Sequence, residues 1–222
     1  MSASERFFEA IAGRYDRVYA LEGASSRERL RRVLGELPPA PARVVDLGVG
    51  TGREIPALLD AGHEVTGVDV SQAMLDRCAR RARPVPLVRA DFWEPLPFAP
   101  SSFDAAVALH GTLAHPPAED AIAKLGAELA RVVRPGGVLV AEVPSPAWLE
   151  RIEALPAMDD RVLRRTGPRT CVYEDRAAGA SIEARVLDAA EWEAALAPTW
   201  RARVEPLGAF EWLVVAHRDP RC

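Results

Sequence analysis

Short apolar runs alternate with amphipathic stretches through the middle of the chain. Continuous or period-two apolar runs predict strands, whereas apolar positions three or four residues apart predict helices. The pattern places strands at 44–47, 63–70, 86–92, 102–110 and 138–143, and helices at 53–61, 72–78 and 118–133. This order of elements is typical of an α/β domain with a mostly parallel sheet and helices on both faces.

The two ends of the chain depart from this regular alternation. Before the core, the pattern predicts helices at 4–19 and 26–35, and the proline-rich stretch 38–41 then leads into the first strand. After Pro144 the order is mixed, with helices at 146–158 and 188–196 and strands at 170–174, 181–187, 200–206 and 210–217. The last two strands are expected to form a terminal hairpin.

The most informative local pattern lies at the end of the first strand. Asp46 follows an apolar run, and glycines then stand at every second position, at Gly48, Gly50 and Gly52. Such glycines allow a sharp turn into the next helix and let a ligand approach the main chain closely. The dinucleotide fingerprint needs glycines at positions one, three and six, and Arg53 occupies the sixth. The spacing therefore argues against a pyrophosphate turn.

With its acid and three glycines, this loop resembles the first motif of the class I S-adenosylmethionine (SAM)-dependent methyltransferases. The resemblance extends to strand ends at Asp69 and Asp91 and to the turn 134–137 before the fifth strand, in the family's order. It implies a Rossmann-like seven-stranded sheet in the order 3-2-1-4-5-7-6. It also implies an N-terminal helical lid and an insertion between the fifth and sixth strands.

The resemblance assigns cofactor-binding roles, with SAM converted to S-adenosylhomocysteine (SAH). Asp46 is expected to meet the positive charge of the cofactor directly or through water. Asp69 is expected to accept hydrogen bonds from the ribose hydroxyls, and Asp91 from the adenine amino group. The remaining assigned residues are the loop glycines and the residues that follow the two later acids: Gly48, Gly50, Gly52, Val70 and Phe92.

Several of these assignments have a competing structural interpretation. In the family, a residue at the position of Met74 often covers one face of the adenine, but a methionine there also suits the core. Tyr15, within the element Ala12–Asp16, is expected over the methionine end of the cofactor or, alternatively, as a core aromatic. Asp91 is also compatible with a plain surface turn.

The loop after the fourth strand holds the candidate catalytic residues. His110 and His115 flank it, and histidine suits proton transfer near neutral pH. His110 is alternatively a cofactor contact through its backbone. The loop 109–112 lacks both the Pro-Pro-aromatic motif of base-amine methyltransferases and the Pro-Cys nucleophile of cytosine-C5 enzymes. We therefore expect methyl transfer to an O or N atom of a small-molecule acceptor.

Composition narrows the range of partners. The 222 residues carry a formal net charge of −4, which disfavours nucleic acid, because phosphate binding depends on lysine and arginine. No run approaches the roughly 20 apolar residues that span a bilayer, and the first nine residues do not resemble a secretory signal. The cysteines, Cys78, Cys171 and Cys222, lack metal-site spacing, so we expect free thiols, no metal and a cytoplasmic location.

We expect one domain over residues 1–222. Its expected parts are a helical lid (1–41), a SAM-binding core (42–144), a substrate-cap insertion (145–187) and a final helix with the terminal hairpin (188–222). Two other functions stay open: a SAM-binding regulatory protein without catalysis, and an NAD(P)-dependent oxidoreductase, which the sixth position of the loop disfavours. A monomer and a homodimer are both compatible with the sequence.

Overall fold

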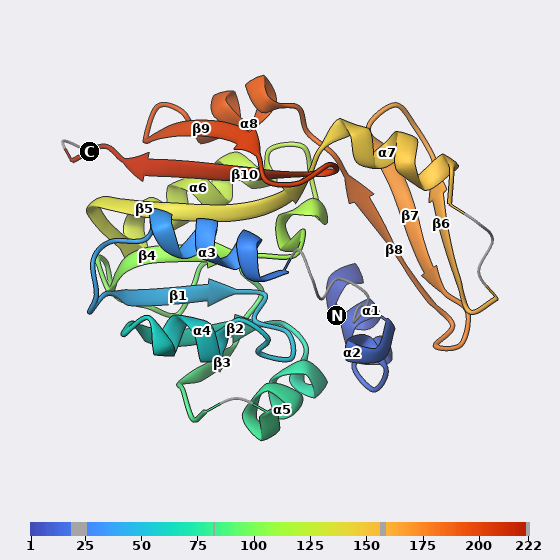
Figure 1. Ribbon diagram of the computed structural model, residues 1–222, viewed down its shortest axis with the longest axis horizontal. Helices are drawn as coiled ribbons and strands as arrows, with labels where there is room; N and C mark the ends of the chain where they lie inside the picture. The colour runs from blue at the N-terminus through green and yellow to red at the C-terminus, as the bar shows by residue number, and fades with distance from the viewer. Residues whose placement is uncertain (19–25, 82, 156–158, 221–222) are drawn as a thin grey trace.

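A seven-stranded sheet forms the centre of the molecule in the computed structural model, which describes residues 1–18, 26–81, 83–155 and 159–220 (Figure 1). The strand order is β3-β2-β1-β4-β5-β10-β9. The strands are β1 (Arg43–Leu47), β2 (Glu64–Asp69), β3 (Leu87–Arg89), β4 (Phe103–Ala108), β5 (Val133–Pro144), β9 (Trp200–Pro206) and β10 (Glu211–Arg218). The pairs β5–β10 and β10–β9 are antiparallel, and the other neighbouring strands of this sheet are parallel. The predicted order is confirmed once the three strands of the insertion are left out of the count.

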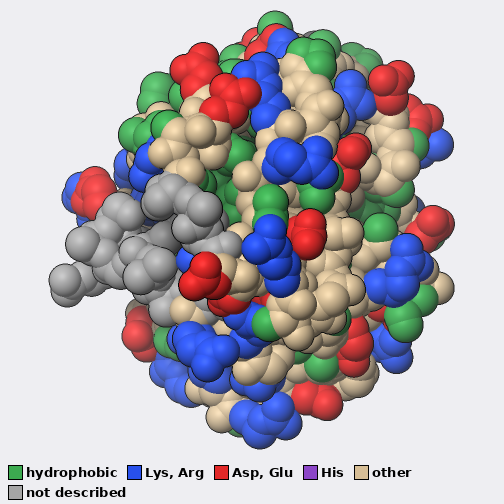
Figure 2. All heavy atoms as spheres, turned by 90° about the vertical axis from the view of Figure 1, so that its right-hand side faces the viewer, with side chains coloured by type: hydrophobic (Ala, Val, Ile, Leu, Met, Phe, Trp, Pro, Cys, Tyr) green, Lys and Arg blue, Asp and Glu red, His purple; other side chains and the backbone are tan. Residues whose placement is uncertain are grey.

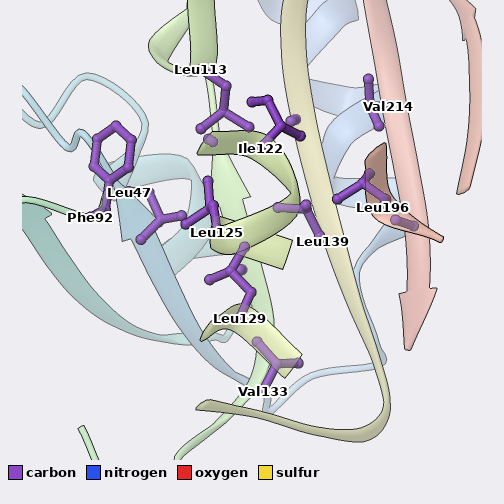
Figure 3. Packing of buried hydrophobic residues seen from close by; sticks show 14 of the residues in the cluster. Leu47, Phe92, Leu113, Ile122, Leu125, Leu129, Val133, Leu139, Leu196 and Val214 are labelled. Atoms are coloured by element: carbon purple, nitrogen blue, oxygen red, sulfur yellow. The ribbon is translucent and has the colours of Figure 1, made fainter. Parts of the chain in front are cut away.

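Helices cover both faces of this sheet, as predicted. Apolar residues of α3 (Ser26–Glu36), α4 (Ile55–Asp60) and α5 (Gln72–Arg81) pack on one face, and those of α6 (Ala121–Val132) and α8 (Ala189–Leu196) pack on the other. Successive residues of β1 belong to different faces: Val44 packs with the first group of helices and Val45 with the second. Figure 3 shows the second face, where Leu125 and Leu129 of α6 lie between Leu47 and Leu139.

The N-terminal segment differs from its prediction. The single helix expected at 4–19 is wrong, because the chain forms α1 (Ala3–Ile11), a turn at 12–14, and then α2 (Tyr15–Val18). Gly13 stands in the turn, and glycine is a poor helix former. The predicted end at Tyr19 lies outside the described residues.

The insertion after β5 forms a small sheet of its own. Helix α7 (Pro146–Glu153) leads into the antiparallel order β6-β7-β8, with bounds Arg161–Arg165, Thr170–Asp175 and Ala180–Arg185. The predicted helix 146–158 is too long at its C-terminal end, and residues 156–158 lie outside the described part of the chain. Strand β6 was not predicted, because its five residues include three arginines and no apolar run.

Helix α1 lies between the main sheet and the insertion, beside α5 and β8 (Figure 1). Phe7 and Ile11 of α1 pack with Met74 of α5 and Ile182 of β8 in one buried cluster. Arg14, just after α1, pairs with Asp175 of β7 at 2.9 Å. The helix therefore bridges the two parts of the molecule.

The outer face of the insertion carries mixed charge. Figure 2 shows acidic and basic side chains interspersed over this side, without a broad area of one sign. Among the described residues, none of the helices combines the length and the apolar composition needed to cross a membrane.

The packing of α6 predicts a large effect for one core substitution. Leu129 is fully buried in this helix, so Leu129→Ala should lower the free energy of unfolding by about 2–5 kcal/mol through lost burial and a residual cavity. The measurement is urea unfolding followed by circular dichroism. Lys124→Ala on the same helix is the control, because its side chain is 70% exposed and its loss should cost under about 0.5 kcal/mol. A Leu129→Ala effect as small as that of the control would contradict the proposed packing.

Candidate active site

The glycine loop leaves β1 and turns into α4 through left-handed backbone conformations. The φ angles of Gly48 and Gly50 are +64° and +52°, in a region that residues with a Cβ rarely adopt. A Cβ on Gly48 would lie 2.5 Å from Cγ2 of Thr112, whereas one on Gly50 would meet only the carbonyl oxygen of Gly48, at 3.8 Å. Packing against Thr112 thus requires the first glycine, and the second leaves the main chain open to a ligand.

Asp69, at the end of β2, holds this loop in place. Its Oδ2 accepts a hydrogen bond from the backbone N–H of Gly50 and its Oδ1 accepts one from Ser71, both at 2.9 Å. The residue is only 6% exposed. Burial raises the pKa of Asp69 to about 6, although the backbone hydrogen bonds oppose this shift. Asp69 is therefore mainly a carboxylate at neutral pH.

Asp46 lies inside the protein rather than on the wall of the site. It is 3% exposed, and its Oδ2 has no hydrogen-bond partner among the described residues. Burial is the main cause that raises the pKa of Asp46 well above its ordinary range, and the charges of Glu54 and Asp69 add to it. Gly52 is also absent from the wall, and its N–H donates within the loop to the carbonyl of Val49.

A cavity of about 550 Å³ opens between the carboxyl ends of the strands, α1 and the insertion. This volume lies in the usual range for small-molecule sites. Its walls bring together the other residues predicted from the sequence: Tyr15, Gly48, Gly50, Asp69, Val70, Met74, Asp91, Phe92, His110 and His115. Asp91 follows β3 in a turn, where its Oδ1 accepts from the N–H of Trp93 at 3.1 Å, and it still lines the cavity.

The loop after β4 brings His110 to the glycine loop. His110 and Gly111 both have left-handed backbone, with φ angles of +54° and +73°. Nε2 of His110 contacts the carboxylate of Glu54, which directly precedes α4. The N–H of Gly111 donates to the carbonyl of Glu142 on β5. The loop is thus fixed to the start of α4 and to the neighbouring strand β5.

His115, five residues further on, lies among aromatic rings on the cavity wall. Its ring centroid is 5.9 Å from that of Phe8 and 6.2 Å from that of Tyr173. Nδ1 lies 2.7 Å from the carbonyl oxygen of Glu183. Since a carbonyl only accepts, Nδ1 carries the proton, and Nε2 of the neutral ring keeps its lone pair. Burial lowers the pKa of His115, which favours this neutral form.

Sequence reasoning missed several wall residues. Arg29 of α3 and Glu142 of β5 form a buried ion pair on the wall. The insertion adds Trp148 and Tyr173, and the residue just before β10 adds Phe210. One signal was available for Glu142, a charged residue inside the apolar run 138–143. No spacing rule marks the aromatic residues, because only the tertiary structure brings them together.

Comparison with known proteins identifies the family. A family model described as a methyltransferase domain matches residues 44–137. The demethylmenaquinone methyltransferase of Renibacterium salmoninarum is 33% identical over 179 residues, which cover 75% of this chain and 72% of the relative. The chain belongs to the class I SAM-dependent methyltransferases.

Two further similarities bear on this methyltransferase. A Micromonospora griseorubida protein named for 23S rRNA (guanine-N(1)-)-methyltransferase activity is 36% identical over 73% of the chain, and the chain spans only 56% of its length. The structure of the CcbJ methyltransferase from Streptomyces caelestis has the same fold, with a TM-score of 0.75, 20% identity, and coverage of 99% of this chain and all of the other.

The residues present fit SAM, the methyl donor of this family. Free space in front of Gly50 leaves its main chain accessible, which a loop close to a sugar requires. The carboxylate of Asp69 lines the same part of the cavity and can accept further hydrogen bonds, since each carboxylate oxygen has two lone pairs. No group of metal-ligating side chains is found within the described ranges.

The contact between Gly48 and Thr112 predicts a structural effect. Gly48→Ala should lower the free energy of unfolding by about 1–3 kcal/mol, because the new methyl group meets Thr112 and the φ angle is positive. Thermal unfolding monitored by circular dichroism measures the change. Gly179→Ala is the matched control: this glycine has a φ of +61° but nothing within 4 Å of an added Cβ. Equal losses for the two variants would show that the Thr112 contact contributes nothing.

Proposed function

We propose that this protein transfers the methyl group of SAM to an O or N atom of a small-molecule acceptor. The observation that carries the proposal is the continuity of the cavity. One wall is the glycine loop with Asp69, and the opposite wall is built from Trp148 and Tyr173 of the insertion. A methyl donor held at the first wall would therefore present its sulfur to a compound held at the second.

The cofactor half is expected to work mainly through backbone and carboxylates. Gly48 and Gly50 let the main chain approach the ligand, and Asp69 accepts from the ribose hydroxyls. Met74 is fully buried and also borders the cavity, so its core role and a contact with adenine are compatible. Phe92 supplies an apolar surface beside Asp91 for the adenine ring.

The chemistry requires orientation more than activation, because the sulfonium of SAM is already a strong methyl donor. Alignment of an acceptor with the S–CH₃ bond can contribute about 7–11 kcal/mol to lowering the barrier. Helix α1 and the insertion border the cavity opposite the sheet, so these elements would exclude water during transfer. The lid within 1–41 would then consist of α1 and α2, since α3 packs on the sheet.

His115 is the better of the two candidate bases. His115 lines the cavity, and because its Nδ1 is bound to the carbonyl of Glu183, Nε2 is the ring nitrogen that can accept a proton. A base placed there can accept the proton of a hydroxyl or protonated amine in the acceptor. His110 instead contacts Glu54, and its place on the wall of the cavity that Gly48 also lines suits a contact with the cofactor.

A small molecule fits the site better than nucleic acid. The cavity is enclosed by α1 and the insertion, and the net charge of −4 opposes binding to a phosphate backbone. The outer face of the insertion also lacks the basic stripe that nucleic-acid binding needs. The name of the Renibacterium relative, a demethylmenaquinone methyltransferase, agrees with a small acceptor. The buried free thiols Cys78 and Cys171 agree with a reducing, cytoplasmic location.

Two substitutions test the cofactor half. Asp69→Ala should weaken SAM binding by at least about tenfold, because hydrogen bonds to a charged group are lost. Gly50→Val should abolish binding, because the side chain fills the space in front of the loop. Isothermal titration with SAM measures both, and Asp76→Ala, an exposed acid on α5, is the control. Unchanged titrations for both site variants would refute the proposed cofactor position.

The tautomer of His115 can be measured directly. Nitrogen-15 NMR should find Nδ1 protonated and Nε2 unprotonated at pH 6.5, with a pKa below the ordinary value of 6.5, and His115→Gln assigns the signals. With an accepted substrate, the same variant should lower kcat by about 10²- to 10⁴-fold and leave SAM affinity unchanged. An imidazolium at pH 6.5, or an unchanged kcat, would exclude His115 as the base.

A further inference from the structure

A chain of ring contacts runs along the part of the cavity that lies beyond the glycine loop. It begins at His115, whose ring packs edge-on to Tyr173 at 6.2 Å. The hydroxyl of Tyr173 accepts a 2.7 Å hydrogen bond from Nε1 of Trp148. The Trp148 ring lies 6.4 Å from that of Phe210, and the guanidinium of Arg151 lies 5.9 Å from the Phe210 centroid. We call these five residues the aromatic wall.

The aromatic wall is assembled from four separate segments. Trp148 and Arg151 belong to α7, Tyr173 to β7, Phe210 precedes β10, and His115 follows the turn after β4. All five residues line the same cavity. The hydrogen bond between Trp148 and Tyr173 fixes the orientation of both rings. A wall of this kind offers a flat apolar surface, which favours stacking or edge contacts with a planar ligand.

Arg151 gives one end of the wall a positive charge. No ion pair joins this guanidinium to a carboxylate of the described residues, although Glu211 also lines the cavity. The guanidinium lies over the face of Phe210. Stacking on Phe210 orients the guanidinium and leaves its N–H donors available. Two of these N–H groups can bind the two oxygens of one carboxylate. Arg29 and Glu142, also on the cavity wall, form an ion pair and together contribute no net charge.

We infer that the acceptor is a planar aromatic acid, with the hydroxyl to be methylated at the His115 end of the wall and a carboxylate at the Arg151 end. This inference rests on the proposed function and specifies its acceptor. The rings of Tyr173, Trp148 and Phe210 contact the flat body of the molecule. The two polar ends of the wall then set its direction in the cavity.

Methyl transfer to this hydroxyl needs only SAM, the acceptor and His115. The acceptor oxygen attacks the methyl carbon from the side opposite the sulfur. The new O–C bond forms as the S–C bond breaks, and the electron pair of that bond returns to sulfur, which gives neutral SAH. The hydroxyl proton passes to Nε2 of His115. The carboxylate at Arg151 takes no part in the bond changes and serves only to orient the ring.

Binding of two matched probes tests the charge requirement. The probes are 4-hydroxycinnamate and its neutral amide, titrated calorimetrically into the protein saturated with SAH. The acid should bind at least about tenfold more tightly than the amide, because an ion pair with hydrogen bonds replaces a neutral contact. In Arg151→Gln the acid-to-amide ratio should fall towards one, and Arg151→Lys should retain part of it. Arg164→Gln, an exposed arginine on β6 outside the cavity, should keep the wild-type ratio.

The outcomes separate this inference from the proposed function. Absence of SAH binding would overturn the proposed function itself. Normal SAH binding with equal affinities for acid and amide, with an unchanged ratio in Arg151→Gln, or with no binding of either probe, would overturn the inference alone. Formation of SAH from SAM in the presence of the acid, lost in His115→Gln with the acid still bound, would support the assigned direction of the acceptor.

Discussion

The hydrogen bond from the N–H of Gly50 to the carboxylate of Asp69 is the constraint on which the site depends. It joins the loop after β1 to the end of β2, so the two neighbouring strand ends act as one rigid unit. The same carboxylate accepts from Ser71, which begins the turn into α5. Burial of this group is unfavourable for the charge, as its pKa of about 6 indicates. Backbone donors offset that cost, and the carboxylate remains able to accept hydrogen bonds from a ligand.

The segment 109–115 fixes the position of the acceptor half of the cavity relative to its proposed cofactor half. Thr112 packs against Gly48 so closely that no Cβ fits between them. Gly111 is bound to the carbonyl of Glu142 on β5, and His115 to that of Glu183 on β8. One short segment therefore contacts the glycine loop, the main sheet and the insertion. A methyl transfer that depends on alignment needs such a rigid connection between donor and acceptor, because small displacements are costly.

Sequence reasoning succeeded for features that depend on regular secondary structure and on local motifs. The strand order and the helices on both faces followed from apolar periodicity, and the motif around Gly48, Gly50 and Asp69 led to residues that line one cavity. It missed the break after Ile11, although Gly13 marks the turn locally, and the strand β6, whose five residues contain no apolar run. It also failed where packing between distant segments decides the structure. The inward burial of Asp46 and the assembly of Trp148, Tyr173 and Phe210 on one wall depend on contacts between segments distant in the chain.

Helix α1 completes the site because it belongs to both halves at once. Its residue Glu9 accepts from the hydroxyl of Ser71 at 2.7 Å, next to Asp69, while Phe8 packs against His115 on the acceptor side. Arg14, beyond its end, is tied to Asp175 of the insertion. A displacement of α1 would therefore break contacts to the cofactor side and to the acceptor side together. The enclosure of the cavity is thus a property of the whole fold, in which the N-terminal helix, the sheet edge and the insertion depend on one another.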